Sequence, residues 1–197
     1  AGVFIETASG LLRRAFAEAQ SRRPPQQVEA DADREIELAD EEYISKGVTT
    51  VHDAGVSFED VDRYKRFVDA GKLRVRLYVM LGEDNARLAA GMAKYRMIGA
   101  GNQHLTVRAV KRLIDGALGS RGAWLLAPYA DQPKSTGLQT TPTDVMNETA
   151  RLAIENGFQV CTHAIGDRAN RETLDIYEAA FKAHPDKRDV RWRLEHA

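Results

Sequence analysis

Three histidines, a residue type that can bind metals, lie at the ends of apolar segments of this chain. His52, His163 and His196 each lie at the carboxyl end of a segment rich in strand-forming residues. Residues at the carboxyl ends of parallel barrel strands converge on one site, and imidazole nitrogens bind zinc and other divalent metals. We therefore predict that His163 and His196 are metal ligands. For His52, with Asp53 beside it, we predict a structural or supporting role.

A lysine interrupts another apolar segment. Alternation along a strand would put Val107, Ala109, Lys111 and Leu113 on one face. Burying an ammonium group without a partner costs free energy. One interpretation is therefore that Lys111 lies at the solvent-exposed end of the strand and pairs with a carboxylate such as Asp115. The alternative is a functional lysine, either carboxylated to bridge metal ions or neutral enough to form a Schiff base with a carbonyl substrate. The residues alone leave these alternatives open.

A long connection without clear periodicity follows that strand, over residues 116–142. Connections of this length in compact domains are usually functional, and this one would lie on the active-site face of a barrel. We predict that Arg121 contacts the substrate there. Trp124 and Tyr129 either do the same or only pack the loop down. Asp115, at the start of the connection, would hydrogen-bond a ligand or fix the turn that follows.

Extended and helical patterns alternate along the chain, which predicts an α/β fold with parallel strands. Strand patterns cover residues 48–53, 74–81, 105–115, 158–163 and 190–196. Helical periodicity covers residues 30–46, 57–71, 85–98, 143–156 and 167–184, with a Ser57–Asp60 capping box and Thr143 as a candidate cap. This order suits a barrel or an open doubly wound sheet. No glycine-rich nucleotide-binding loop follows any strand, which disfavours the nucleotide-binding versions of the open sheet.

The composition is that of an ordinary globular domain, which we place over residues 1–197 as a single unit. The chain has 28 Lys and Arg against 29 Asp and Glu, so nothing points to nucleic acid or a membrane as a partner. No segment approaches the length of a membrane span. The single cysteine, Cys161, rules out a disulfide framework within the chain and favours a reducing, cytoplasmic location. The chain begins with Ala1, so an export signal before it is not excluded.

Four segments resemble the motifs of amidohydrolase family 3, in the order in which that family has them. Val110–Arg121 resembles its VK…DGALGSR signature, and Thr162–Asn170 resembles its HAIGDRAN segment. Arg193–Ala197 is similar to its Arg-Ile/Leu-Glu-His segment, and Gly47–Asp53 to its GVTTVHD strand. The resemblance covers essentially the whole chain.

The resemblance implies a distorted TIM-barrel hydrolase with one or two divalent metal ions, zinc above all. By motif, Lys111 matches the family's strand lysine, which is often carboxylated, and His163 and His196 match its two single histidines. We add Asp115 and Arg121 to Lys111 as candidate catalytic residues. The activity implied is hydrolysis of non-peptide carbon–nitrogen bonds, such as amides, in a small-molecule substrate. A homo-oligomer is possible.

The chain also departs from the family pattern. It contains no His-x-His pair, and no strand follows His196 to bring the aspartate that serves as general base. We therefore expect an internal fragment with about strands two to six of the barrel. Alone, it should be inactive, bind metal poorly and associate through its open sheet edges. The alternatives are a Lys111 Schiff-base aldolase or lyase, and a non-catalytic barrel that binds small molecules.

Overall fold

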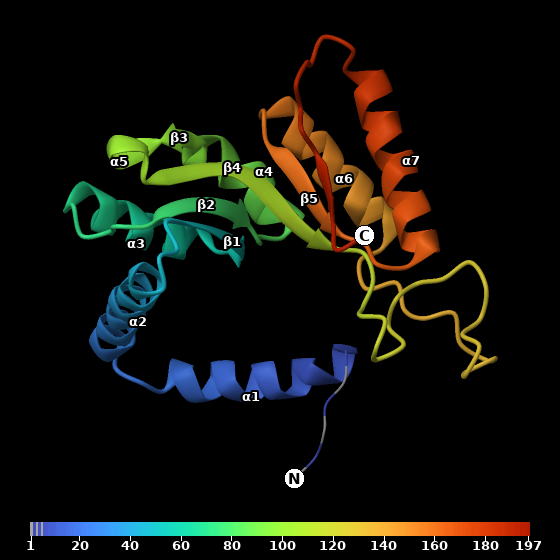
Figure 1. Ribbon diagram of the computed structural model, residues 1–197, viewed down its shortest axis with the longest axis horizontal. Helices are drawn as coiled ribbons and strands as arrows, with labels where there is room; N and C mark the ends of the chain where they lie inside the picture. The colour runs from blue at the N-terminus through green and yellow to red at the C-terminus, as the bar shows by residue number, and fades with distance from the viewer. Residues whose placement is uncertain (1, 3, 5) are drawn as a thin grey trace.

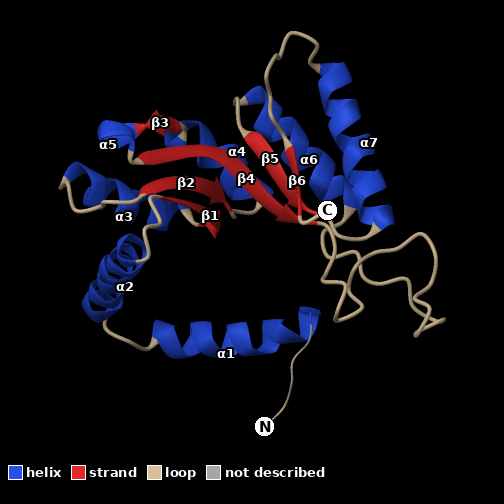
Figure 2. Ribbon diagram, in the orientation of Figure 1, coloured by secondary structure: helices blue, strands red, loops and turns tan. Residues whose placement is uncertain are grey.

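The computed structural model describes residues 2, 4 and 6–197 and alternates helices with strands (Figures 1 and 2). The amino-terminal half contains η1 (Glu6–Ala8), α1 (Ser9–Ser21), α2 (Pro25–Ser45), β1 (Thr50–Val56), α3 (Phe58–Asp69), β2 (Arg76–Leu81), α4 (Asn85–Tyr95), β3 (Met97–Gly99) and α5 (Ala100–Gln103). The remainder contains β4 (Leu105–Leu113), α6 (Thr143–Glu155), β5 (Gln159–His163), α7 (Asp167–Ala183) and β6 (Arg193–Glu195).

The strand order decides between the two predicted architectures. Parallel strands follow one another in the order β1-β2-β4-β5-β6, and the short β3 pairs with β4 in the antiparallel sense. A doubly wound sheet reverses its order at a switch point, whereas a barrel adds each strand beside the previous one. The sheet therefore has barrel topology, which confirms the predicted α/β fold and partial TIM-like barrel.

The two faces of the sheet differ in chemistry. The outer face is apolar: Leu77, Val79 and Leu81 of β2 are buried in one core with the helices. On the inner face, Met80, Ala109 and Cys161 form a smaller buried cluster against Tyr78. Cys161 is therefore a small core residue.

The prediction that Val107 shares a face with Ala109 was wrong. Val107 belongs to the outer core, whereas Ala109 belongs to the inner cluster. The register between β2 and β4 shifts at this point, because Val79 pairs with Val107 and Met80 with Ala109. A bulge of this kind inserts one residue and exchanges the faces of those that follow. Lys111 and Leu113 therefore stay with Ala109 on the inner face.

Local signals located some element ends and missed others. The prediction that His52 and Asp53 end the first strand was wrong, because β1 continues to Val56. Ser57 Oγ accepts a hydrogen bond from Asp60 N at 3.1 Å, as the capping box predicts. Thr143 does not cap α6, because it is the first helical residue and Pro142 precedes it without a side-chain cap. Ile98, predicted to be helical, lies in β3.

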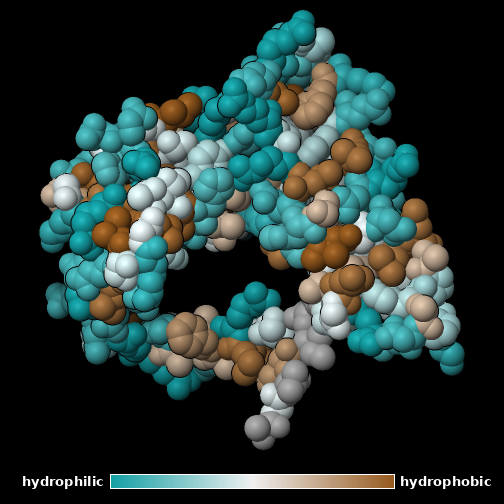
Figure 3. Space-filling view, in the orientation of Figure 1, coloured by the Kyte–Doolittle hydropathy of each residue, from teal (hydrophilic) through white to brown (hydrophobic). Residues whose placement is uncertain are grey.

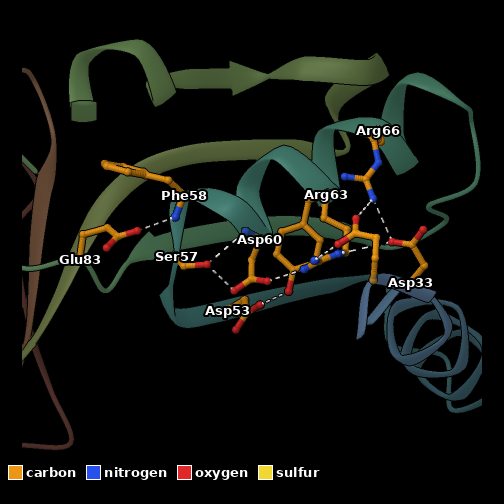
Figure 4. Close-up of polar contacts among 10 residues, drawn as sticks. Asp33, Asp53, Ser57, Phe58, Asp60, Arg63, Arg66 and Glu83 are labelled. Carbon is orange, nitrogen blue, oxygen red and sulfur yellow. Dashed lines mark hydrogen bonds and ion pairs between the residues drawn. The ribbon is translucent and has the colours of Figure 1, made fainter. Parts of the chain in front are cut away.

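Polar contacts fix α2 to the barrel. Arg63 of α3 donates to Glu29 at 2.6 Å, and Arg66 donates to Asp33 at 3.0 Å, so two turns of α2 are held against α3 (Figure 4). At the other end of α2, the buried Asp40 accepts bonds from the backbone N of Arg74 and Val75, both at 2.9 Å.

The helix α1 stands apart from the sheet. It contains no buried residue, and the space-filling view shows an opening between it and the strands (Figure 3). It runs from the start of α2 towards the carboxyl ends of β4 and β5 (Figure 1). Within the described residues, no helix is long and apolar enough to cross a membrane.

Candidate metal centre

Two of the predicted ligands are in contact at the carboxyl ends of neighbouring strands. His163 ends β5, and its ring lies 5.0 Å from that of His196, edge to face, between centroids. His196 follows β6 with a left-handed backbone (φ 73°), which interrupts the alternation of the strand. The structure thus brings together the imidazoles of His163 and His196.

The acid that precedes His196 does not face the helices. Glu195 pairs in register with His163 on the inner face and accepts a bond from Arg193 Nε at 2.9 Å. The Arg193 guanidinium lies over the Tyr78 ring, 5.5 Å from its centroid. Glu195 therefore orients a neighbouring side chain inside the barrel.

Lys111 lies on the same inner face, beside Cys161 in the register of β4 and β5. Its side chain is half-buried, and this burial lowers the pKa of the ammonium; the charge of Glu195 offsets only part of the effect. Among the described residues, no carboxylate lies within ion-pair distance of its Nζ. The interpretation that Lys111 pairs with Asp115 was wrong.

Asp115 forms hydrogen bonds with other parts of the chain instead. Its buried carboxylate accepts backbone N–H bonds from Gly166 at 2.7 Å, Trp124 at 2.9 Å and Ile165 at 3.1 Å. One of its oxygens, Oδ1, lies 3.4 Å from His163 Nε2. Asp115 thus ties the long connection to the turn after β5 and contacts a predicted ligand at the same time.

The remaining residues of the long connection mainly hold it in place. The exposed Arg121 donates from Nε to Asp131 of the same loop at 3.0 Å. Tyr129 is buried and donates from its hydroxyl to the Ala123 carbonyl at 2.8 Å, and Arg168 stacks on Trp124, 4.6 Å from the ring centroid. These contacts support the packing interpretation for Trp124 and Tyr129. They give no support to a catalytic Arg121, which stays a prediction.

Two cavities open at this end of the barrel, and Leu113 and Thr141 line both. The larger, of about 720 Å³, is lined by Asp115 and His163 together with Thr7, Ser9 and Arg13 from the amino-terminal segment. Lys111 lines the other, of about 350 Å³, between the ends of β2 and β4. The structure therefore brings Asp115, His163 and His196 together, whereas Lys111, on the same face of the sheet, lines a different cavity.

The donor chemistry suits a divalent metal, but the ligand set on this chain is partial. Imidazole nitrogens bind zinc and related ions, and a carboxylate that contacts a ligand histidine commonly orients its ring. Among the side chains that the structure describes, no group of three or more histidines, cysteines, aspartates or glutamates is arranged to hold a metal. His163 and His196 would supply two ligands, and Lys111 could supply a third only in carboxylated form.

The geometry agrees with the comparison of the chain with protein families. Residues 4–197 match the model described as the amidohydrolase family. The chain belongs to this family. The match covers the strands, the histidine pair and the long connection described above.

Several known proteins are similar to the chain. Protein LONG AFTER FAR-RED 3 of Arabidopsis thaliana is 32% identical over 184 residues, covering 87% of the chain and 31% of that protein. N-substituted formamide deformylase of Arthrobacter pascens is 26% identical over 208 residues, covering 100% of the chain and 35% of that enzyme. A crystal structure of an uncharacterized metal-dependent hydrolase from Pyrococcus horikoshii superposes with a TM-score of 0.68 at 28% identity, covering 77% of the chain and 31% of that structure. The chain thus spans about a third of each of these proteins.

Proposed function

We propose that this chain forms part of a metal-dependent hydrolase that cleaves non-peptide carbon–nitrogen bonds in small molecules. The observation that carries the proposal is the contact between His163 and His196, whose rings lie 5.0 Å apart at the carboxyl ends of β5 and β6. Membership of the amidohydrolase family supports hydrolysis in general. The name of the formamide deformylase supports a carbon–nitrogen bond as the target.

Each residue has a distinct part in the proposed site. His163 and His196 hold the metal, for which we propose zinc, and Asp115 keeps the His163 ring in place from 3.4 Å. A divalent metal bound there would lower the pKa of a water molecule and polarise the scissile carbonyl. Because Asp115 is buried and bound by three N–H groups, its part is to position His163 rather than to carry protons.

Lys111 would complete the ligand set by becoming an anion. Burial favours its neutral amine, whose nitrogen can attack the carbon of carbon dioxide. A new N–C bond then forms, one N–H proton leaves to solvent, and a carbamate remains. The same neutral amine is also what a Schiff-base enzyme requires, so the two lysine chemistries need a direct test.

Metal analysis of the full-length protein that contains this chain tests the proposal. We expect bound zinc in the unaltered protein and its loss when His163→Ala and His196→Ala are combined. His184→Ala is the matched control, because that histidine follows α7, away from the pair, and bonds to the Ala180 carbonyl. Loss of metal in the control alone, or its retention in the double variant, would contradict the proposal. A protein that never binds metal would favour the non-catalytic binding barrel.

The covalent modification of Lys111 distinguishes the proposed hydrolase from the alternative aldolase or lyase. Intact-mass measurement under native conditions should show the added mass of carbon dioxide, and Lys111→Ala should remove it. Trapping of a carbonyl compound on Lys111 by borohydride would favour the aldolase or lyase instead.

A further inference from the structure

A buried arginine ties the end of the strand that carries Lys111 to two helices. Arg112 is the next residue of β4, and 8% of it is exposed. Its side chain faces the helices, because side chains alternate across a strand and Lys111 faces the barrel interior. The guanidinium donates from Nε to Thr149 of α6 and from Nη2 to Asn85, the first residue of α4, both at 2.9 Å. One planar group therefore holds α4 and α6 against the end of β4.

The third bond of Arg112 goes to the backbone of Lys111. Its Nη1 donates to the Lys111 carbonyl oxygen at 3.0 Å. The strand β2 ends at Leu81, which pairs with Val110, so Lys111 is the first residue of β4 beyond the ladder between these two strands. Backbone groups that a sheet neighbour no longer reaches need another partner. The guanidinium bonds the backbone at the place where β2 stops doing so.

The burial of a charged group at this position costs free energy. Burial lowers the pKa of Arg112 to about 10, and the charge of Asp84 offsets only part of the effect. In the part of the chain that the structure describes, no acidic side chain lies within ion-pair distance of the guanidinium. An apolar side chain of similar volume often stabilises a protein as well as a buried ion does, or better. The role of the arginine is therefore to be sought in the geometry that its three bonds fix.

We propose that Arg112 is a positioning residue for Lys111: it holds the end of β4 so that the lysine side chain enters the cavity of about 350 Å³ that both residues line. This inference rests on the proposed function, because that function gives Lys111 its task. Arg112 acts through the Lys111 carbonyl and touches neither substrate nor metal. A substitution that breaks this bond should displace Lys111, whereas one that breaks only the bond to α6 should not.

Two variants separate these bonds. Arg112→Met removes all three and keeps a long apolar side chain in the space. Thr149→Val is the matched control, because it removes one acceptor of the guanidinium and leaves the bond to the Lys111 carbonyl. Thr149 is fully buried and also bonds to the Val145 carbonyl at 3.0 Å, so its variant should lower the thermal stability as well. Lower stability alone therefore does not distinguish the two variants, and the state of Lys111 does.

The first measurement is the carbon dioxide adduct on Lys111, detected by native mass spectrometry of the full-length protein. We expect Arg112→Met to lose most of the adduct and to weaken zinc binding about tenfold, as loss of a group behind a metal ligand commonly does. Thr149→Val should keep both.

Arg112→Lys should retain part of the adduct, since it keeps the charge but not the planar fork, and it takes the place of Arg112→Met if that variant does not fold. A full adduct in the Arg112 variants would overturn the inference. Equal losses in Arg112→Met and Thr149→Val would overturn it as well.

A second measurement keeps the inference distinguishable from the proposed function. Reductive methylation of the metal-free protein, followed on tryptic peptides, reports how accessible the Lys111 amine is, with the exposed Lys94 of α4 as internal reference. We expect Arg112→Met to raise the rate at Lys111 several-fold relative to Lys94, because the half-buried amine is released, and Thr149→Val to leave the ratio unchanged. If the unaltered protein carries neither adduct nor zinc, the proposed function fails, while this ratio still tests Arg112. The same ratio in all three proteins would contradict the role of Arg112.

Discussion

At the scale of single residues, the hydrogen bonds of Asp115 make it a site where substitution should destabilise the protein. Its carboxylate accepts three backbone N–H bonds from two loops, and it lies against His163. In Asp115→Asn, the new amide N–H₂ would face backbone N–H groups where the carboxylate oxygen accepted bonds. We expect the free energy of unfolding to fall by about 3 kcal/mol, because charged hydrogen bonds are lost and buried donors stay unpaired.

Urea denaturation of the full-length protein measures this change. Asp175→Asn is the control, since Asp175 is exposed on α7, and it should change stability by less than about 0.5 kcal/mol. If both variants unfold at the same urea concentration, Asp115 does not have the structural role that its hydrogen bonds imply.

The role of Asp115 also shows what residue patterns could and could not predict. Both alternatives considered for it, fixing the turn and contacting a ligand, agree with its contacts. Its donors lie 9, 50 and 51 positions away, so no local pattern could identify them. The orientation of Glu195 could not be fixed from strand alternation either, because the left-handed backbone of His196 interrupts it.

At the scale of elements, one buried acid attaches the helix α2 to the two residues that precede β2. Burial alone would raise the pKa of Asp40, but bonds from the Arg74 side chain, at 2.6 Å, and from two backbone N–H groups outweigh it and lower the pKa below 3.8. A carboxyl group with a lowered folded pKa stabilises the protein above its unfolded pKa. That contribution is lost as the pH falls through the folded value.

We therefore expect the unfolding free energy to decline as the pH is lowered from about 4, in part through protonation of Asp40. Asp40→Asn should be less stable than the unaltered protein at pH 7, and its stability should decline less on acidification. Thermal unfolding between pH 3 and pH 7 measures both. Parallel pH profiles for the two proteins would show that Asp40 titrates alike in the folded and unfolded states.

Most element types were predictable, although the helix α1 and the strand β3 were not, and the exact ends depended on neighbours in space. Hydrophobic periodicity located the strands β1, β2, β4, β5 and β6, but the exchange of faces after Val107 depends on how β4 pairs with β2. The sequence placed the long connection on the active-site face of the barrel, but it did not give the contacts that hold the connection there. It packs so closely on the turn after β5 that a Cβ on Gly166 would lie 1.8 Å from the Trp124 carbonyl oxygen.

At the scale of the whole molecule, the described chain leaves apolar and hydrogen-bonding surface without a partner. The strands β1 and β6 each have one neighbour in the sheet, so each presents an unpaired edge. The helix α1 exposes Leu12 and Phe16, which are 53% and 66% accessible and one helical turn apart. In relatives about three times as long as the chain, other segments are available to cover such surfaces.

We expect the isolated 197-residue chain to associate in solution, and light scattering coupled to gel filtration would show this as a mass above 21.9 kDa.

Two surfaces could cause this association, the apolar face of α1 and the unpaired sheet edges, and substitutions on α1 distinguish between them. The double variant Leu12→Glu with Phe16→Glu removes the apolar pair, whereas Ala17→Glu adds charge to an exposed position and keeps the pair. If α1 drives association, the double variant alone becomes monomeric. If the sheet edges drive it, as unpaired parallel strands predict, both variants stay associated. A monomer of the unaltered chain at all concentrations would contradict both explanations.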